Sequence, residues 1–561
     1  MKIRNDRPRV WLTPARLEWQ RQSQQRDQWQ ALLKACESDW KTTSANPLTN
    51  FALVGVVTRS QRHIDKAKQL VEKYISMDTD ALLRVGATSP HGFGARIVLP
   101  AVASAYDWLY PWLTADERTR WADQLMAWAD WVWLETNPTR SDWAQNSPGD
   151  NFYIGYLQSL TAALAVFNDH PRAQTHIDLG LVKLAPLTAF LTKYGGASLE
   201  GTNYGTFIRH AFLFSALSTA TDLNPFVSPA LSPWFRDLAL SRWHLTAPDL
   251  AHLAPFGDQA ADVTAPITGN HRAAMLVLST HADPDTAALA RGWLDTTRYS
   301  AAREFAYQEA LWYTPGVKKL DVGLNYWSRG SGTVSMRSGW KADSLWVPFE
   351  CGPGKEAHQD RGANNFALQY KGEWLTAPAR IWGHGGGMGQ SRYLNVILVG
   401  GKEQTGQVSG SHLPADGPLV ISFSEGVPSG AMVLGEAARA YDYWKSPKVV
   451  PVLNKYERRF LFTPALKRMN VIDTIEKVNP AESIIWQLQV KNMPVLAAKK
   501  FTARGEKAAL VGTVLSPANV TLRADPVNKA KDGSLSSWTV QVVVSDPSPK
   551  VTISVLLEVK E

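Results

Sequence analysis

The hydrophobic period of the sequence changes once, near residue 320, and this change limits the folds that the chain can adopt. Before it, apolar residues recur at the three- and four-residue spacing of amphipathic helices. After it, short apolar runs are separated by Gly, Pro, Asn and Asp, a pattern typical of strands joined by turns. The 561 residues also exceed one ordinary core. We therefore expect two domains, 1–318 and 319–561.

The first domain shows one helical pattern after another, with almost no strand signal. Thr114 and Glu117 have the spacing of a capping box, which marks the start of one helix. A series of paired helices favours an (α/α) toroid, and no legible repeat period supports a regular solenoid. The expected helices span Arg16–Trp40, Gln61–Met77, Ala95–Trp112, Ala115–Glu135, Tyr153–Asn168, Ala173–Thr192, Thr206–Thr221, Ser232–Leu245, Asn270–His281 and Pro284–Thr297.

The second domain shows strand patterns without helices between them, which predicts a large antiparallel β-sandwich. The expected fold class is therefore α+β, with an N-terminal (α/α) toroid followed by a C-terminal antiparallel β-sandwich. The expected strands span Thr333–Arg337, Leu345–Cys351, Asn365–Tyr370, Leu394–Val399, Leu419–Ser424, Ala431–Leu434, Arg458–Phe462, Val471–Ile475, Ile484–Val490, Ala509–Gly512, Val520–Arg523, Trp538–Val544 and Val551–Val559.

Composition excludes several classes of protein. Hydrophobic residues make up 45% and charged residues 20%, as in a soluble globular protein. No apolar run approaches the ~20 residues that span a bilayer, so we expect no membrane partner. The N-terminal residues lack an apolar signal segment; the protein is expected in the cytoplasm, or in the periplasm or outside the cell if a signal peptide has been removed. Cys36 and Cys351 are isolated, which excludes a disulfide scaffold and a cysteine zinc site.

The charge favours an anionic partner without identifying it, and an acidic polysaccharide would suit it. The formal charge is +8, and the basic residues are dispersed rather than gathered in a block. Such an excess steers anionic partners toward the protein. Nucleic acid is not expected, because no basic patch or binding motif occurs. The 23 tryptophans include enough flat apolar faces for some to pack on sugar rings. The sequence leaves the oligomeric state open.

A polar stretch at residues 356–372 is the first candidate for chemistry. His358, Asp360 and Arg361 precede an expected strand, and Lys371-Gly372 gives a tight-turn signal after it. Three such side chains beside a strand can form part of a site. A polar edge loop explains the same residues equally well.

A glycine-rich stretch at residues 195–205 is the second candidate, since it joins two helices and ends in Tyr204. Arg209 and His210 follow on the next helix. A tyrosine at a helix start near Arg or His can have its phenol pKa lowered enough to exchange a proton. The alternative is a turn with a packed tyrosine.

Three further segments carry polar groups at irregular positions. Asn146 and Asn151 lie in an Asn-rich joint, where Asn151 could bind a carboxylate or cap the next helix. Arg96 at a helix start could hold an anion or could simply be solvated. The glycine-rich segment 383–389 carries His384, with Arg380 and Arg392 nearby, and is either a flap over a site or a plain linker.

Taken together, these segments resemble the heparinase II/III-like polysaccharide lyases, a group that includes alginate and glycosaminoglycan lyases. The resemblance covers nearly the whole chain, and the His358–Phe366 segment carries its clearest part. The other matching segments are Arg7–Thr13, Ala105–Tyr110 with Leu113-Thr114, Glu200-Gly201 with Tyr204, Gly372–Leu375 and Asn395–Gly401.

The resemblance implies β-elimination on a polysaccharide that contains uronic acid. It assigns Tyr204 as the acid and a candidate base, Asn151 as the partner of the uronate carboxylate, and His358 as a catalytic residue facing the same cleft. His210 is a further candidate catalytic residue. Substrate binding is expected from Arg96, Asn146, Glu200, Arg209, Arg361, His384 and Arg392.

The sequence departs from the family pattern at two places. Phe152 stands where the family often has a histidine, so the base is Tyr204, His210 or His384. The family's structural zinc ligands are replaced as well, with Asp360, Ala377 and Leu394 at the matching positions, and Gly362 stands where the motif has an aspartate. Asp360 is the only plausible ligand left, so we expect no zinc site and no other cofactor.

Two other functions remain open from the sequence. A glycoside hydrolase on a helical toroid would use paired carboxylates, such as Glu200 with Asp150 or Asp258. A glycan-binding protein that has lost catalysis is the second alternative, because the zinc and histidine positions are replaced.

Overall fold

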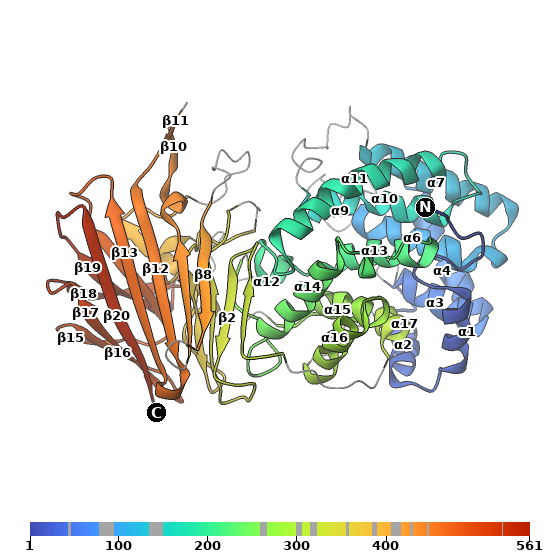
Figure 1. Cartoon of the computed structure of the whole chain (residues 1–561). Coiled ribbons are helices and arrows are strands. Elements are labelled where there is room, and N and C mark those ends of the chain that lie inside the picture. Colours follow the sequence, from blue (N-terminus) through green and yellow to red (C-terminus); the bar gives the residue numbers. More distant parts are fainter. Residues whose placement is uncertain are drawn as a thin grey trace. The chain divides into compact units, whose positions relative to one another are not determined.

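The computed structural model forms two compact units (Figure 1). The first comprises Met1–Lys193, Phe207–Ala239 and Thr268–Leu320, and the second comprises Tyr194–Thr206, Leu240–Ile267 and Asp321–Glu561. The residues that the structure describes are 1–42, 47–77, 95–133, 148–149, 151–257, 266–298, 306–314, 322–354, 358–383, 390–405, 417–426, 430–445, 448–529 and 531–561.

The first unit is mainly helical in its described part. Its helices begin and end as follows: α1 Pro14–Gln22, α2 Asp27–Ser38, α3 Leu48–Thr58, α4 Gln61–Ile75, α6 Ala95–Leu109, α7 Ala115–Trp133, α9 Asn151–Tyr156, α10 Gln158–Ala165, α11 Ala173–Tyr194, α13 Ile208–Ala220, α14 Ser232–His244, α15 Gly269–His281, α16 Pro284–Thr296 and α17 Ala306–Trp312. The last residue of α11 and the last turns of α14 belong to the second unit.

The helical sequence patterns explain most of these elements. In α4 the buried residues recur at three- and four-residue spacing, as an amphipathic helix requires. The capping box before α7 forms as expected: Thr114 N donates to Glu117 Oε2 at 2.8 Å, and Glu117 N donates to Thr114 Oγ1 at 3.1 Å. The first-domain prediction of successive helices is therefore confirmed.

Two expected helices are interrupted, and two helices, α3 and α17, were missed. The predicted helix Arg16–Trp40 is divided into α1 and α2 by the turn at 23–26. The predicted helix Tyr153–Asn168 is divided at Leu157 into α9 and α10. Helix α3 was not predicted, because its run is apolar on every side and lacks the amphipathic period of a surface helix.

The N-terminal segment packs on α6 through one buried carboxylate. Asp107 accepts hydrogen bonds from the backbone nitrogens of Arg9 (2.6 Å) and Val10 (2.9 Å), and Arg7 Nη1 lies 3.0 Å from its other oxygen. Trp108 Nε1 donates to the Val10 carbonyl at 2.8 Å. The segments Arg7–Thr13 and Ala105–Tyr110, which both carried the family resemblance, thus contact each other.

The second unit contains antiparallel sheets, and every described strand pairing is antiparallel. Strands β1 Asn325–Ser328, β2 Thr333–Arg337, β3 Leu345–Glu350, β5 Leu368–Tyr370 and β6 Glu373–Thr376 form one sheet in that order, and β4 Asn365–Phe366 pairs with β3. A four-stranded sheet has the order β18 Thr521–Asn528, β19 Leu535–Val544, β14 Ile484–Val490, β7 Ile397–Val399.

The largest sheet has eight strands, and a small ribbon joins β10 Tyr443–Lys445 to β11 Lys448–Val450. In the eight-stranded sheet the order is β15 Val495–Ala497, β16 Lys500–Arg504, β17 Ala509–Ser516, β20 Lys550–Lys560, β13 Arg468–Lys477, β12 Leu453–Thr463, β9 Ala431–Glu436 and β8 Leu419–Glu425. One hydrophobic core takes side chains from all three larger sheets, including Phe349, Phe460 and Trp486. The expected antiparallel second half is therefore confirmed.

The turn after β5 forms as the sequence predicts. Lys371 and Gly372 have φ values of 52° and 75°, and β5 pairs with β6 across them. Two successive positive φ values are typical of a hairpin turn whose twist matches the strands.

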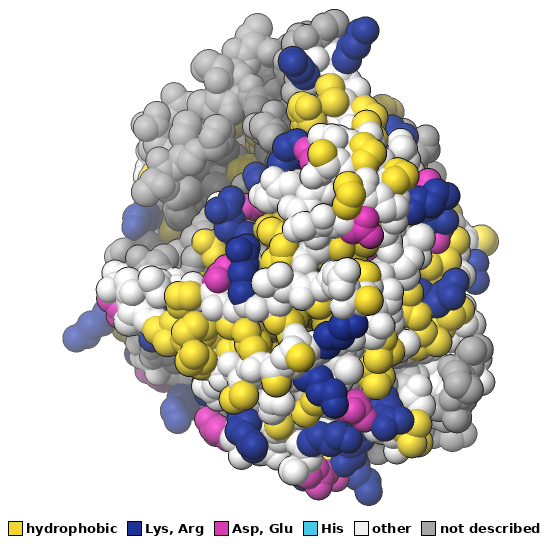
Figure 2. Space-filling view, turned by 90° about the vertical axis from the view of Figure 1, so that its left-hand side faces the viewer, with side chains coloured by type: hydrophobic (Ala, Val, Ile, Leu, Met, Phe, Trp, Pro, Cys, Tyr) yellow, Lys and Arg dark blue, Asp and Glu magenta, His cyan; other side chains and the backbone are white. Residues whose placement is uncertain are grey.

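The dispersed charge is visible on the surface. Figure 2 shows Lys and Arg side chains spread over one face among acidic, hydrophobic and other groups, with no single basic block. Among the described residues, no helix is both long enough and apolar enough to cross a membrane.

Candidate active site

Two of the predicted catalytic residues contact each other in the second unit. The rings of Tyr204 and His358 stack face to face, with centroids 3.6 Å apart and planes inclined by only 4°. Tyr204 is 39% exposed. The contact joins two segments that are far apart in the sequence.

Tyr204 ends the one-turn helix α12, Gly201–Tyr204, in the glycine-rich segment. Gly201 has a φ of +77°, which favours glycine, and it lies where a Cβ atom would be 2.3 Å from the Phe256 carbonyl oxygen. Glycine therefore lets the chain turn into α12 while its backbone touches a second segment. Sequence spacing alone could not show this contact.

That second segment is the turn at 254–257, which holds α12 by hydrogen bonds. The backbone nitrogen of Thr202 donates to the Phe256 carbonyl at 3.0 Å, and its hydroxyl donates to the Ala254 carbonyl at 2.7 Å. The next residue, Gly257, also has a positive φ, +78°, and its backbone faces Glu200 and Gly201. The start of the helix that carries Tyr204 is thus held by the hydrogen bonds of Thr202 and by the close approach of Gly257.

Arg242 fixes the other end of α12. Its guanidinium is buried and donates to the Gly205 carbonyl, while Ser241 Oγ donates to the Gly196 carbonyl at 3.1 Å. Burial lowers the pKa of Arg242 to about 10, so the group stays positively charged at neutral pH. Sequence reasoning missed Arg242, because its role depends on a contact between α14 and a distant loop.

Asp360, two residues after His358, is held in a buried ion pair. Arg380 donates from Nη1 to Oδ1 at 2.8 Å and from Nη2 to Oδ2, which makes the pair bidentate. The backbone nitrogen of Gly257 donates to Oδ2 at 3.0 Å, and Arg380 Nη2 also reaches the Pro255 carbonyl at 3.2 Å. The side chains of Asp360 and Arg380 are 1% and 11% exposed.

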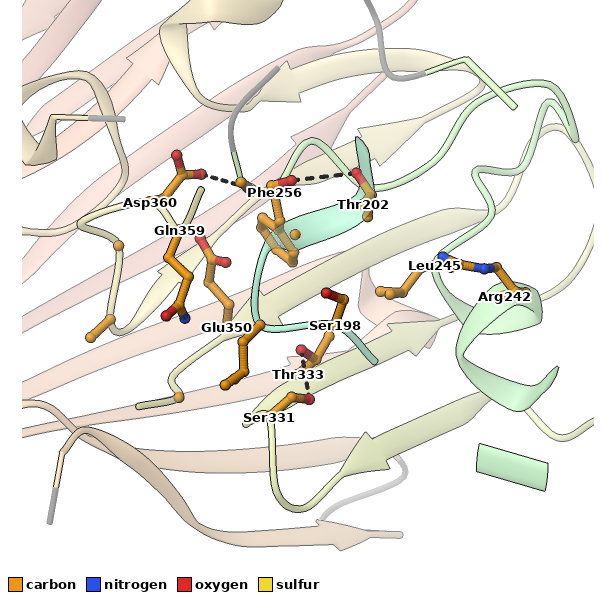
Figure 3. A pocket seen from close by; sticks show the side chains of 16 residues that line it. Ser198, Thr202, Arg242, Leu245, Phe256, Ser331, Thr333, Glu350, Gln359 and Asp360 are labelled. Atoms are coloured by element: carbon orange, nitrogen blue, oxygen red, sulfur yellow. Dashed lines mark hydrogen bonds between the residues drawn. The ribbon is translucent and has the colours of Figure 1, made fainter. Parts of the chain in front are cut away.

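A small cavity of about 40 Å³ lies within this arrangement (Figure 3). It is large enough to hold water. Glu350 at the end of β3 lines it, and Asn365 Nδ2 donates to Glu350 Oε1 at 2.8 Å. Burial, together with the negative charge of Asp360, raises the pKa of Glu350 well above its usual range. Glu350 was not predicted; a charged residue ending an apolar strand run was its only sequence signal.

The first unit has a larger cavity of about 230 Å³, and two predicted substrate-binding residues line it. These are Arg96 of α6 and Arg209 of α13, and among the described lining residues none is acidic. The Arg96 guanidinium lies 5.1 Å from the centre of the Phe152 ring. Apolar and aromatic walls complete the cavity, and its remaining described lining residues are Trp11, Thr49, Ile97, Pro100, Ala101, Ile208, Phe212, Asn270 and Tyr307.

His210 lies elsewhere in the first unit, buried beside the rings of Phe207 and Trp234. Burial, with a smaller effect from Arg209, lowers the pKa of His210 to about 3. Its Nε2 atom has no hydrogen-bond partner among the residues that the structure describes. A histidine of this kind is a weak base at neutral pH.

The remaining predicted site residues have varied surroundings. Arg392 forms an ion pair with Glu403, and Arg361 is half-buried with its backbone carbonyl bonded to Ser391. Glu200 is buried immediately before α12. Asn151 begins α9, but its side chain is outside the described residues, as are Asn146 and His384 and the alternative carboxylates Asp150 and Asp258.

The residues at the family's zinc positions do not fit a metal ion. Asp360 already accepts hydrogen bonds from Arg380 and Gly257 through its two oxygens. Ala377 and Leu394 are buried and apolar, and Gly362 has no side chain. Zinc needs nitrogen, sulfur or oxygen ligands, usually four in a structural site, and a guanidinium beside the single carboxylate would repel a cation. Nowhere in the described part of the chain do three His, Cys, Asp or Glu residues gather as a metal site.

Solved structures of polysaccharide lyases resemble this chain in fold. The heparan sulfate lyase HepC from Pedobacter heparinus has a TM-score of 0.59 and 14% identity, and the match covers 92% of this chain and 75% of that one. A heparinase III structure has a TM-score of 0.58 and 11% identity, covering 91% and 76%. A mutant of the Streptomyces coelicolor A3 chondroitin AC lyase has a TM-score of 0.53 and 12% identity, covering 98% and 83%.

No protein-family model and no curated protein sequence matches the chain. The likeness to solved structures therefore concerns the fold. At that level it confirms the resemblance to heparinase-like polysaccharide lyases that the sequence motifs indicated.

Proposed function

We propose that the protein is a polysaccharide lyase that cleaves a uronic-acid-containing, anionic polysaccharide by β-elimination. The observation that carries the proposal is the stacking of Tyr204 on His358 at 3.6 Å, within a fold like that of heparan sulfate, heparin and chondroitin lyases. The neighbours' names favour a glycosaminoglycan-type substrate. In this proposal the helices form an (α/α) toroid, and the sheets form a β-sandwich, with the domain boundary at 318/319.

The reaction needs a base for the C5 proton and an acid for the departing O4. Tyr204 performs both steps: its phenolate takes the C5 proton, the C5 electron pair forms the C4–C5 double bond, and the C4–O4 bond breaks. The phenol that results gives its proton to O4, which restores the phenolate. His210 is less suited to the first step, since burial lowers its pKa to about 3.

The uronate carboxylate must be stabilised as charge develops on it during proton removal. In the proposal His358 donates to this carboxylate and Asn151 is its second partner. Arg96 and Arg209 supply positive charge to the substrate, supported by the cavity that both line. Arg361, Arg392, Glu200, Asn146 and His384 remain proposed contacts to the polysaccharide.

A panel of acidic polysaccharides tests the proposal directly. Purified protein is incubated with heparan sulfate, heparosan, chondroitin, hyaluronan, alginate and glucuronan, while ultraviolet absorbance and reducing ends are followed together. A lyase yields both signals in equal amounts, because each cleavage creates one unsaturated uronate. Reducing ends without absorbance would indicate a hydrolase, and binding without either product would indicate a glycan-binding protein. Both of these outcomes reject the proposal.

A further inference from the structure

The Tyr204–His358 stack joins two loops. These loops are also connected by contacts other than the two rings. Tyr204 belongs to the 194–206 segment, and His358 belongs to the turn before β4. Between them lies the 254–257 turn, which bonds to α12 through Thr202. The position of one ring relative to the other therefore depends on how the 254–257 turn is held against the His358 turn.

Asp360 and Arg380 make that connection. Asp360 accepts the Gly257 N–H, and Arg380 donates to the Pro255 carbonyl, so both charged groups bind the 254–257 turn. They also bind each other in a bidentate pair. Because Asp360 is only two residues from His358, fixing its carboxylate limits the movement of the histidine.

Burial makes this connection stiff. The Asp360 side chain is 1% exposed, so bulk solvent has little access to its oxygens. A bidentate guanidinium–carboxylate pair also fixes direction, since two parallel N–H···O bonds share one plane. A single lysine ammonium would keep the charge but lose this planar geometry.

We propose that Asp360 and Arg380 are a positioning pair that holds the two loops in register, so that Tyr204 and His358 stack without a bound metal. The residues at the family's zinc positions do not fit a cation, and the guanidinium supplies the positive charge that Asp360 requires. The expected effect of this pair on the reaction rate rests on the proposed lyase function. Its expected effect on the position of the His358 ring does not.

The structural consequence is measured on the His358 ring. Protein labelled with ¹³C and ¹⁵N at histidine gives imidazole resonances, and the His358 signal is identified by its loss in His358→Gln. Stacking at 3.6 Å places the imidazole in the ring current of Tyr204. Tyr204→Leu gives the position of the unstacked signal. We expect Asp360→Asn to move the His358 resonance at least halfway toward that position, and Arg380→Met to do the same.

Arg380→Lys and Glu309→Gln complete the set. In Arg380→Lys, the His358 resonance should lie between its wild-type and Arg380→Met positions. If Asp360→Asn does not fold, Arg380→Lys is measured in its place. Glu309 pairs with Arg272 in the first unit, with side chains 17% and 9% exposed, and is the matched ion-pair control. Glu309→Gln should leave the His358 signal unchanged. EDTA should change neither the signal nor the melting temperature.

The kinetic reading uses whichever polysaccharide is cleaved. Asp360→Asn should lower kcat at least tenfold with KM within about twofold, because misplaced rings impair the proton transfers more than substrate binding. An unmoved His358 resonance in folded Asp360→Asn, or an EDTA-sensitive resonance, would overturn the proposal. If the wild type cleaves nothing, the lyase proposal fails, while the resonance still decides whether the pair positions the rings.

Discussion

At the scale of single residues, His358 contacts Tyr204 through its ring face, so two substitutions separate stacking from chemistry. His358→Phe keeps a flat ring but removes the nitrogens that would bind the uronate carboxylate. Because a hydrogen bond to a charged group is worth about 1.5–3 kcal/mol, we expect at least about a tenfold loss of kcat/KM. His358→Ala removes the stack as well and should lose more. Initial lyase rates check both.

The control for this pair is His63→Gln, a half-buried histidine on α4 in the first unit. It should leave kcat/KM unchanged. Wild-type rates in His358→Phe would contradict a chemical role for the imidazole and leave only its stacking.

At the scale of elements, a single substitution can test the close contact between α12 and the 254–257 turn. Gly257 has a φ of +78°, and a Cβ there would lie 2.4 Å from the Glu200 carbonyl oxygen. We expect Gly257→Ala to cost more than the roughly 1–2 kcal/mol of left-handed backbone strain, since the two backbones must also separate. Lyase activity should fall with it, because α12 carries Tyr204. Denaturant unfolding and initial rates measure the two effects.

Gly401→Ala is the matched control. Gly401 has nearly the same φ, +75°, and no atom lies within 4 Å of the position of its Cβ. Gly401→Ala should lose only the free energy of left-handed backbone strain and should keep full lyase activity. Equal destabilisation in the two variants, with activity retained in both, would show that the close approach at Gly257 is unimportant.

The same elements show how far local sequence patterns reach. The period of the apolar residues predicted the helices of the first unit and most strands of the second, since each period records which face is buried. It failed at α3, whose buried residues leave no polar face. The hairpin turn at Lys371-Gly372 was predicted because two turn residues are enough to define such a turn.

Contacts between distant segments were predicted only where motifs supplied them. Tyr204 and His358 were both singled out, and they do meet. The partner of Asp360 was not predicted, because Arg380 is one of many arginines and nothing in its neighbourhood points to that carboxylate. For the same reason, nothing in the sequence pattern indicated that 194–206 and 240–267 join the second compact unit.

At the scale of the whole molecule, buried histidines contribute to the dependence of stability on acid. Burial lowers the pKa of His210 in the first unit and of His244 in the second to about 3. In the unfolded chain both protonate near their ordinary value of about 6.5. Their contribution is therefore fully present above that value and is lost as pH falls toward about 3. Each costs up to about 1.4 kcal/mol per pH unit over this window.

Urea unfolding at a series of pH values between neutral and mildly acidic checks this expectation. His210→Leu cannot take up the proton in either state, so its stability should fall less steeply with acid than that of the wild type. His252 is the control of opposite sign, since its hydrogen bond to Asp249 raises its pKa. The stabilisation from His252 is present below about 6.5 and lost as pH rises, so His252→Gln should remove it on the acid side. An unchanged acid slope in His210→Leu would contradict the account.

The measurement that tests the central claim most directly is the lyase rate of Tyr204→Phe on the polysaccharide that the wild type cleaves fastest. Phenylalanine keeps the ring that stacks on His358 and removes only the hydroxyl. The account predicts an absorbance rate lower by about 10²–10⁴-fold, with unchanged melting temperature and polysaccharide binding, because one group performs both proton transfers. A Tyr204→Phe rate within a few-fold of the wild-type rate would contradict it.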